Sequence, residues 1–206
     1  MQFSPHGGYE SPDYHYFLDV SPGRLRFGHF LGVLSVPLYL LGYWHVSRAL
    51  EPAALWLRRA VLLLAGYTFA VANVWLGQRI FLAQTVQAQD GASGPVNAVL
   101  APLLEEFAGD NEPLIQLVRV LVFVLSILIV IPILRGQTTY PRWMAAFTPI
   151  VLLAAIFASY FIAPRIGVYL LPAAMNVAHV VFFGLSTWVF YRAGRRSLSD
   201  PLLPSN

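Results

Sequence analysis

The chain has 206 residues, of which 57% are hydrophobic and only 11% are charged, with a formal net charge of +3. Soluble domains carry roughly 25% charged residues, so this composition is too poor in charge to cover a soluble surface and indicates a membrane protein. The 13 basic residues are all arginine and flank the apolar runs, a pattern typical of topology-setting charge rather than of a nucleic-acid surface.

Five apolar stretches are long enough to cross a bilayer, which requires about 20 mainly apolar residues. They cover about residues 28–50, 59–84, 113–134, 143–163 and 168–191. Backbone groups in lipid must bond within their own segment, so these stretches predict helices. We therefore expect residues 1–206 to form one all-α domain, a polytopic transmembrane helix bundle of about five spans.

The arginines predict the orientation of this bundle. Eight lie in the first-to-second connection, the third-to-fourth connection and the C-terminal tail: Arg48, Arg58, Arg59, Arg135, Arg142, Arg192, Arg195 and Arg196. The opposite side holds three, Arg24, Arg26 and Arg165. Because arginine accumulates in cytoplasmic connections, we expect a multi-pass protein of the bacterial inner (cell) membrane with its N-terminus outside and its C-terminus cytoplasmic.

Residues 85–112 are predicted to form an outer loop. Within it, Pro95 opens the segment VNAVLAPLLEEF, whose apolar residues recur at helical spacing. This pattern predicts a short amphipathic helix at the membrane interface, although Pro102 interrupts it. The alternative is a loop that caps the bundle.

The fifth span, LLPAAMNVAHVVFF at residues 170–183, carries Pro172, Asn176 and His179. At 100° per residue these three lie on one helix face, near the middle of the span. A polar face at this depth should contact protein or a cavity. Two interpretations stay open: Asn176 and His179 bind a ligand or proton, or they form hydrogen bonds to another helix.

The third span repeats the spacing, with Gln116, Arg119 and Ser126 at the offsets of Asn176, His179 and Ser186. Arg119 lies inside the span and needs a polar partner, for which we expect Glu105, Glu106 or Glu112. In the second span, Trp75 and Arg79 are four residues apart and can stack as a cation–π pair, or Arg79 can extend to the outer headgroups. If Arg79 and Arg119 converge, they form an anion site for a lipid headgroup.

Catalytic and cofactor signatures are sparse. The chain has no cysteine, so disulfides, thiolate nucleophiles and iron–sulfur clusters are excluded. His29, His45 and His179 lie at different depths, which argues against haem, and no carboxylate within a span complements them for a metal. The sequence also contains no nucleophile elbow, zinc-protease motif or phosphate loop. These features favour a protein that is not an enzyme.

Three segments resemble an uncharacterised family of bacterial polytopic membrane proteins, a domain of unknown function. The resemblance rests on Ser21, Arg24, Leu25, Gly28, Gly32, Gly42, Tyr43, Trp44 and His45 in the first segment, and on Tyr140, Pro141, Trp143, Pro149, Pro172 and Asn176 in the later two. Members of that family have a further helix before the Tyr-rich segment, whereas this chain begins near Gly7 and Gly8 and is expected to lack it. The resemblance implies no activity, substrate or catalytic residue.

Three functions remain open at this point. The first is a non-enzymatic accessory subunit of a membrane complex, or a binder of a hydrophobic ligand such as a lipid, quinone or pigment. Its expected partners are the lipid bilayer and other membrane subunits, not nucleic acid. The second is a small transporter that uses Asn176 and His179. The third is a lipid-modifying enzyme with His179 as the acid–base group, which the lack of an intramembrane carboxylate disfavours.

Overall fold

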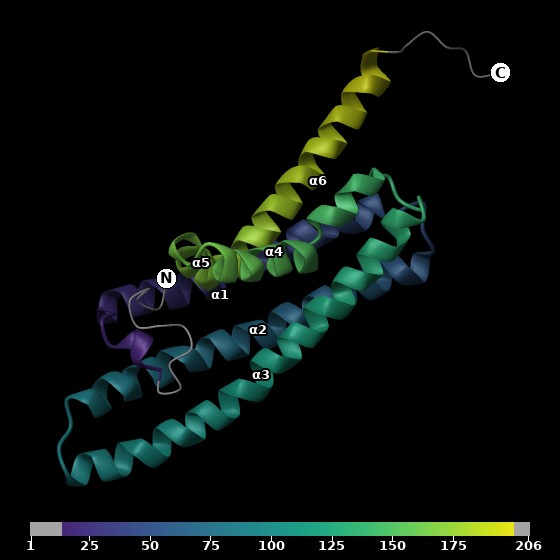
Figure 1. The fold of residues 1–206 in the computed structure, drawn as a ribbon. Coiled ribbons are helices and arrows are strands. Elements are labelled where there is room, and N and C mark those ends of the chain that lie inside the picture. The colour runs from purple at the N-terminus through teal and green to yellow at the C-terminus, as the bar shows by residue number, and fades with distance from the viewer. Residues whose placement is uncertain (1–13, 200–206) are drawn as a thin grey trace.

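The computed structural model describes residues 14–199, and these form helices joined by short connections, with no strand among them (Figure 1). The element order is η2 (His15–Phe17), α1 (Pro22–Ala49), α2 (Leu55–Asp90), α3 (Pro95–Leu134), η3 (Arg142–Phe147), α4 (Pro149–Ile162), α5 (Pro164–Leu170), η4 (Leu171–Ala173) and α6 (Ala174–Ser199). The predicted all-α fold is confirmed. The predicted departure from the family at Gly7 and Gly8 lies outside the described residues.

Within the described residues, four helices are long and apolar enough to cross a membrane, namely α1, α2, α3 and α6, and α4 is a shorter apolar helix. They correspond to the first, second, third and fifth predicted spans, and α6 covers the last of these only from Ala174. The predicted fourth span, 143–163, is divided: its first part is the 3₁₀ helix η3, and α4 has 14 residues. Fourteen residues rise about 21 Å, less than the ~30 Å hydrocarbon core. Proline limits α4 at both ends, because Pro149 begins it and Pro164 follows it.

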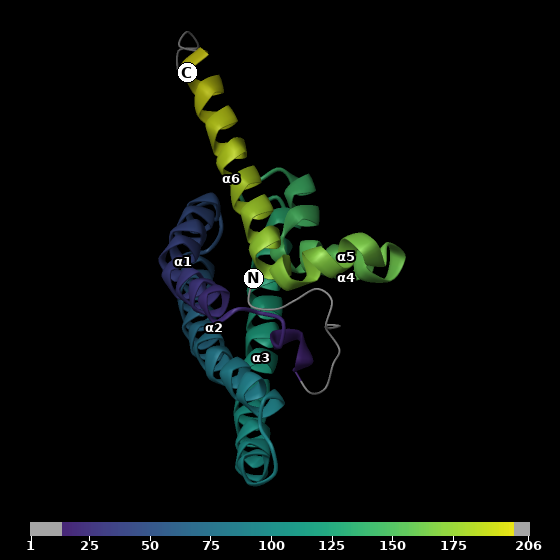
Figure 2. The ribbon, with the colours of Figure 1, turned by 90° about the vertical axis from the view of Figure 1, so that its left-hand side faces the viewer.

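The fifth span also differs from its predicted boundary. The backbone of residues 164–173 forms α5 and then η4, and the long helix α6 begins only at Ala174. Pro172 has no N–H to give to an α-helical ladder, and the 3₁₀ turn η4 is built around it. Together α4, α5 and η4 project to one side of α1, α2 and α3 (Figure 2).

The prediction that residues 85–112 form a loop is wrong, because most of them are helical. Helix α2 continues to Asp90, four residues connect it to α3, and α3 runs without interruption through Pro102 and Pro113 (Figure 1). Of the apolar face expected to lie on the membrane, Leu104 packs against buried residues of α2 and the N-terminal segment, whereas Val96 and Val99 are 57% and 69% exposed. Helices of 36 and 40 residues rise about 54 and 60 Å, well beyond the ~30 Å hydrocarbon core. We call residues 78–90 and 95–112 the distal hairpin.

The buried residues form two separate clusters. The larger joins α1, α2, α3, η3 and α6, and includes Tyr43, Phe69, Leu125, Met144 and Phe182. The smaller lies at the base of the distal hairpin, where Tyr16, Phe17, Val20 and Leu25 pack against Leu82, Ala83 and Val86. The N-terminal segment is therefore folded onto α2, and the molecule has a second core at the end away from the arginine-rich connections.

Two of the arginine-rich connections meet at one end of the bundle. The backbone N–H of Thr139, in the α3–η3 connection, donates to the carbonyl of Ala49 at the end of α1 (2.9 Å). In the α1–α2 connection, Glu51 pairs with Arg48 (3.2 Å) and with Arg58 (3.5 Å). Helix α6 extends past this same end (Figure 1). The α1–α2 and α3–η3 connections, two of the three arginine-rich segments predicted to share one side, therefore lie together in the fold.

Candidate functional site

The polar face of α6 is directed into the bundle at His179. This side chain is buried, with 1% of its surface exposed. Its Nδ1 lies 2.7 Å from the carbonyl oxygen of Met175, and its Nε2 lies 2.9 Å from the hydroxyl of Tyr43 on α1. A carbonyl only accepts, so Nδ1 carries a proton, and Nε2 of the neutral ring accepts from the Tyr43 hydroxyl. Both ring nitrogens are therefore engaged within the protein.

Asn176 makes a second connection between the same two helices. The Tyr39 hydroxyl donates to the Asn176 Oδ1, one turn of α1 away from the Tyr43–His179 bond. Unlike His179, Asn176 is exposed at the surface of the bundle, and Tyr39 is half-buried. The predicted polar face thus forms two hydrogen bonds between α1 and α6.

Aromatic rings surround His179 on three helices. Its ring centroid lies 5.0 Å from Tyr39, 5.6 Å from Phe69 on α2 and 5.5 Å from Phe183 on α6. Phe69 in turn stacks on Tyr39 at 4.4 Å. These partners were not identified from the sequence. The signal was available, because Tyr39 and Tyr43 are four residues apart and so share one face of α1.

Gly42 allows α1 and α6 to approach so closely. A Cβ atom at Gly42 would lie 2.4 Å from the Phe183 ring, which is inside van der Waals contact. Any larger residue would have to move that ring, which itself contacts Tyr43 and His179. The small residue and the ring together position the Tyr43–His179 bond.

A third polar bond links α6 to the connection after α3. The Tyr140 hydroxyl lies 2.6 Å from the Ser186 hydroxyl, and both residues are buried. Burial raises the pKa of Tyr140 to about 12, although the bond from Ser186 opposes this shift. Tyr140 is therefore a neutral hydrogen-bonding group and not a base.

The corresponding residues of α3 have a different environment. Gln116 and Arg119 are exposed, whereas Ser126 is buried and its hydroxyl has no partner in the described part of the chain. Gln116 Nε2 donates to the carboxylate of Glu112, one turn earlier. Arg119 forms no ion pair or hydrogen bond with any side chain that the structure describes. Equal spacing has not produced equal surroundings.

The predicted carboxylate partner of Arg119 is therefore absent among the described residues. Glu105 and Glu106 belong to the same continuous helix and lie 14 and 13 residues before Arg119, or about 20 Å along its axis. Glu112 is closer but bonds to Gln116. The prediction assumed a flexible outer loop that could fold back, and an unbroken α3 cannot do so.

Contacts between helices show how deep Arg119 lies along the axis of the bundle. Gly32 of α1 lies against Leu76 of α2, and Asn111 of α3 donates to the carbonyl of Trp75 (3.1 Å), so these residues share one level. Arg119 comes eight residues after Asn111, about 12 Å farther along α3, which runs antiparallel to α2 (Figures 1 and 2).

That displacement brings Arg119 close to the level of Tyr67 and Phe69 of α2, and so close to the level of the His179 cluster. Phe69 is ten residues from each of the charges that flank it on α2, Arg59 and Arg79. Measured against these two charges of α2, Arg119 lies near the midpoint of the apolar part of the bundle, on its outer surface; along α3 itself it lies seven residues from Glu112 and sixteen from Arg135. Its neighbours Val120 and Phe123 are 58% and 51% exposed, as expected for a surface that faces lipid or another protein.

Arg79 has a different role from the one proposed with Arg119. Its guanidinium lies over Trp75 (4.9 Å), which is one of the two alternatives given for Arg79, and also over Phe17 (5.1 Å) and Tyr16 (5.8 Å) of the N-terminal segment. It donates to the Tyr16 hydroxyl at 3.3 Å. The antiparallel register separates it from Arg119, which lies about ten residues deeper. The structure does not bring the two arginines together into an anion site.

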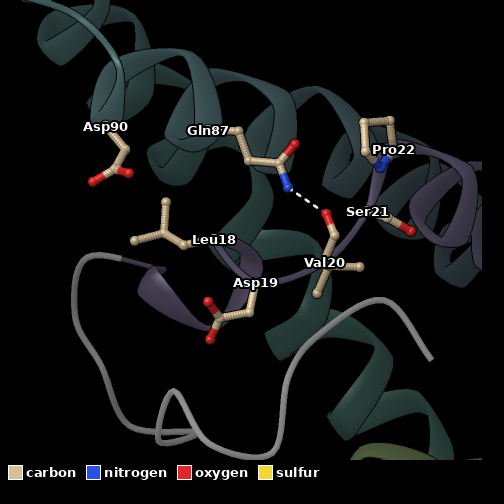
Figure 3. Close-up of a pocket in the computed structure, with 7 residues that line it drawn as sticks. All are labelled: Leu18, Asp19, Val20, Ser21, Pro22, Gln87 and Asp90. Atoms are coloured by element: carbon tan, nitrogen blue, oxygen red, sulfur yellow. Dashed lines mark hydrogen bonds between the residues drawn. The ribbon is translucent and has the colours of Figure 1, made fainter.

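A pocket of about 380 Å³ lies beside the second core (Figure 3). It is lined by Leu18, Asp19, Val20, Ser21, Pro22, Gln87 and Asp90. Gln87 donates to the carbonyls of Phe17 (2.8 Å) and Val20 (2.7 Å), which fixes the N-terminal segment. Asp19 and Asp90 are exposed on either side of Leu18. Sequence reasoning did not find this pocket, because it forms only when the segment folds onto α2.

The described residues contain no group of three or more histidine, aspartate or glutamate side chains that could hold a metal ion. No curated protein and no solved structure matches the chain significantly. A model of a family of unknown function, DUF6796, matches residues 8–193, nearly the whole chain. The resemblance to an uncharacterised family is confirmed: this helical chain, with its membrane-length apolar helices, belongs to the DUF6796 family.

Proposed function

We propose that this protein is a non-enzymatic subunit of a membrane complex, located in the bacterial inner membrane with its N-terminus outside. Its four apolar helices of membrane length support the location. The orientation is supported by the arginine-rich connections at one end, because arginine gathers in cytoplasmic connections. At that end Arg192 also lies over Trp188 (4.1 Å), and tryptophan is common at either membrane interface. The distal hairpin would then lie outside.

The observation that carries this proposal is the uncovered Arg119. A charged side chain near the middle of a bilayer is unfavourable by at least about 2.5–3.5 kcal/mol and normally faces protein or water. Here it faces outward, beside Val120 and Phe123, without a partner in the described chain. A second membrane component against this face would remove that penalty, so the surface has the properties of an interface.

The transport and enzyme alternatives lack a comparable observation. Transport through the Asn176 and His179 face requires groups that can exchange partners with a substrate. Tyr39 and Tyr43 already bond to these residues, and aromatic rings fill the space around His179. Acid–base chemistry at His179 also has no carboxylate to orient the ring. This face is better explained as the contact that holds α6 to α1.

The proposal is tested by purifying the tagged chain from its native membrane in a mild detergent. We expect size exclusion with light scattering to give an assembly that contains another membrane protein in fixed stoichiometry. The absorption spectrum of the same sample, and the lipids extracted from it, test the alternative that the chain binds a hydrophobic ligand such as a pigment, a quinone or a lipid. A single colourless species that contains only this chain and loosely bound detergent would contradict the proposal.

A further inference from the structure

The exposed face of α3 carries a polar stripe, Glu112, Gln116 and Arg119, that descends from the base of the distal hairpin to mid-depth. We infer that this stripe binds a transmembrane helix of another protein, and that this helix carries a carboxylate at the depth of Arg119. The inference rests on the proposed function and names the chemistry of the partner.

Charge complementarity is the first argument. The guanidinium of Arg119 offers five N–H donors, and no acceptor in the described chain takes any of them. A carboxylate accepts two of these donors in a bidentate pair, which is the strongest interaction available to arginine at low dielectric. The described part of α1, α2 and α6 supplies no carboxylate at this depth, since the acidic residues lie in the connections and in the distal hairpin. We therefore assign the complementary charge to a partner outside the described chain.

The surroundings of Arg119 fit a helix better than a small ligand. Val120 and Phe123 add exposed apolar surface on one side of it, and Gln116 lies one turn above it on the same face. Residues 116, 119, 120 and 123 have the i, i+3, i+4, i+7 spacing of a helix–helix contact. Two apolar residues can then pack while the two polar ones specify the depth of the partner.

A second copy of this chain fits less well. In a symmetric pair of parallel helices, the same face would meet itself, and Arg119 would lie opposite Arg119. Like charges at that separation repel. A complementary partner avoids this repulsion.

A lipid phosphate also fits less well. Phosphates lie at the bilayer boundary, whereas Arg119 is about ten residues deeper than Arg79 by the register of α2 and α3, or roughly 15 Å. Glu112, on the same face and closer to that boundary, repels an anion that approaches Arg119 from the headgroups. A carboxylate fixed within a transmembrane helix does not have to pass Glu112.

The test uses the full chain in phosphatidylcholine vesicles with synthetic transmembrane peptides as probes. The peptides are alanine–leucine helices that differ only at one central residue, which is Glu, Gln or Leu. Because the chain has no cysteine, Ala92→Cys in the α2–α3 connection gives a single dye site for energy transfer to the labelled peptide. The variants are Arg119→Gln, Arg119→Lys and the control Arg26→Gln, an exposed arginine near the start of α1.

We expect the unmodified chain to bind the Glu peptide at least about three-fold more tightly than the Leu peptide, and more tightly than the Gln peptide. Arg119→Gln should abolish the preference for Glu over Gln, and Arg119→Lys and Arg26→Gln should keep it. The Lys variant also covers the case in which Arg119→Gln fails to fold. Arg119→Glu should reverse the preference toward a peptide with a central Lys.

Three results would overturn the inference: equal binding of the Glu and Leu peptides, a Glu preference that survives Arg119→Gln, or a preference that disappears when part of the phosphatidylcholine is replaced by phosphatidylglycerol. The last result would assign Arg119 to the headgroup of an anionic lipid. A native assembly without a Glu preference would contradict this inference alone. A lone chain in native membranes that still prefers the Glu peptide would contradict the proposed function instead.

Discussion

Two faces of this molecule have the same polar spacing and opposite environments. On α6, Asn176, His179 and Ser186 bond to Tyr39, Tyr43 and Tyr140 of the same chain. On α3, Gln116 and Arg119 are exposed, and the hydroxyl of Ser126 is buried without a partner in the described residues. The comparison teaches that spacing selects which residues share a face. The residues on the neighbouring helix decide whether that face becomes internal packing or an interface.

The largest expected difference in stability is between alanine variants of His179 and Arg119. His179→Ala removes a buried ring and leaves the Tyr43 hydroxyl without an acceptor, so we expect the free energy of unfolding to fall by about 2–4 kcal/mol. Arg119→Ala, at the same depth on the exposed face, should change it by less than about 0.5 kcal/mol in detergent. Denaturant titration of both variants in one detergent measures the difference. Equal losses would show that the two faces are not distinct.

Gly42→Val tests the close contact between α1 and α6. The new side chain would overlap the Phe183 ring, and we expect a loss of about 1–3 kcal/mol in the same titration. Combining it with Phe183→Ala should give less destabilisation than the sum of the two single changes, because the second change makes room for the first. Strict additivity would contradict the contact.

Removing single tyrosine hydroxyls compares how much the two hydrogen bonds between α1 and α6, Tyr43–His179 and Tyr39–Asn176, contribute to stability. Tyr43→Phe leaves the buried Nε2 of His179 without a donor and should cost about 1–2 kcal/mol. Tyr39→Phe acts at a half-buried residue whose partner Asn176 is exposed, so its effect should be smaller in detergent. Thermal melting of the two variants side by side checks the order. The reverse order would place the main connection at Asn176.

The smallest expected change in stability is at the two buried serines, Ser186 and Ser126. Ser186→Ala leaves the buried Tyr140 hydroxyl without its partner and should lower stability by about 1 kcal/mol. Ser126→Ala removes a buried hydroxyl that bonds to nothing described, so it should be neutral or slightly stabilising. A loss of stability at Ser126 equal to that at Ser186 would indicate an undescribed partner on α3.

Several features were predictable because they depend on local pattern. Apolar runs of about 20 residues mark α1, α2, α3 and α6, and helical geometry places Asn176 and His179 on one face. The cation–π contact between Trp75 and Arg79 also follows from a separation of four residues on one helix. Each of these depends on residues near one another in the chain.

The failures share a different cause. The distal hairpin was missed because Pro102 suggested a break, yet packing against α2 keeps α3 continuous through it. The partner expected for Arg119 was wrong for the same reason, since a continuous helix holds Glu105 and Glu106 far from it. The pocket beside Asp19 and Asp90 depends on the N-terminal segment reaching α2. Each of these needs the register between segments distant in sequence.

By itself, the sequence determined the helical membrane character, the family and the residues that share each polar face, because composition and a period of 3.6 residues are local properties. Only the tertiary structure decided that His179 is enclosed by α1 and α2 while Arg119, at a similar depth, is left uncovered. The physical reason is that burial depends on what packs opposite a residue. Tyr43 and Phe69 lie opposite His179, and in the described chain nothing lies opposite Arg119.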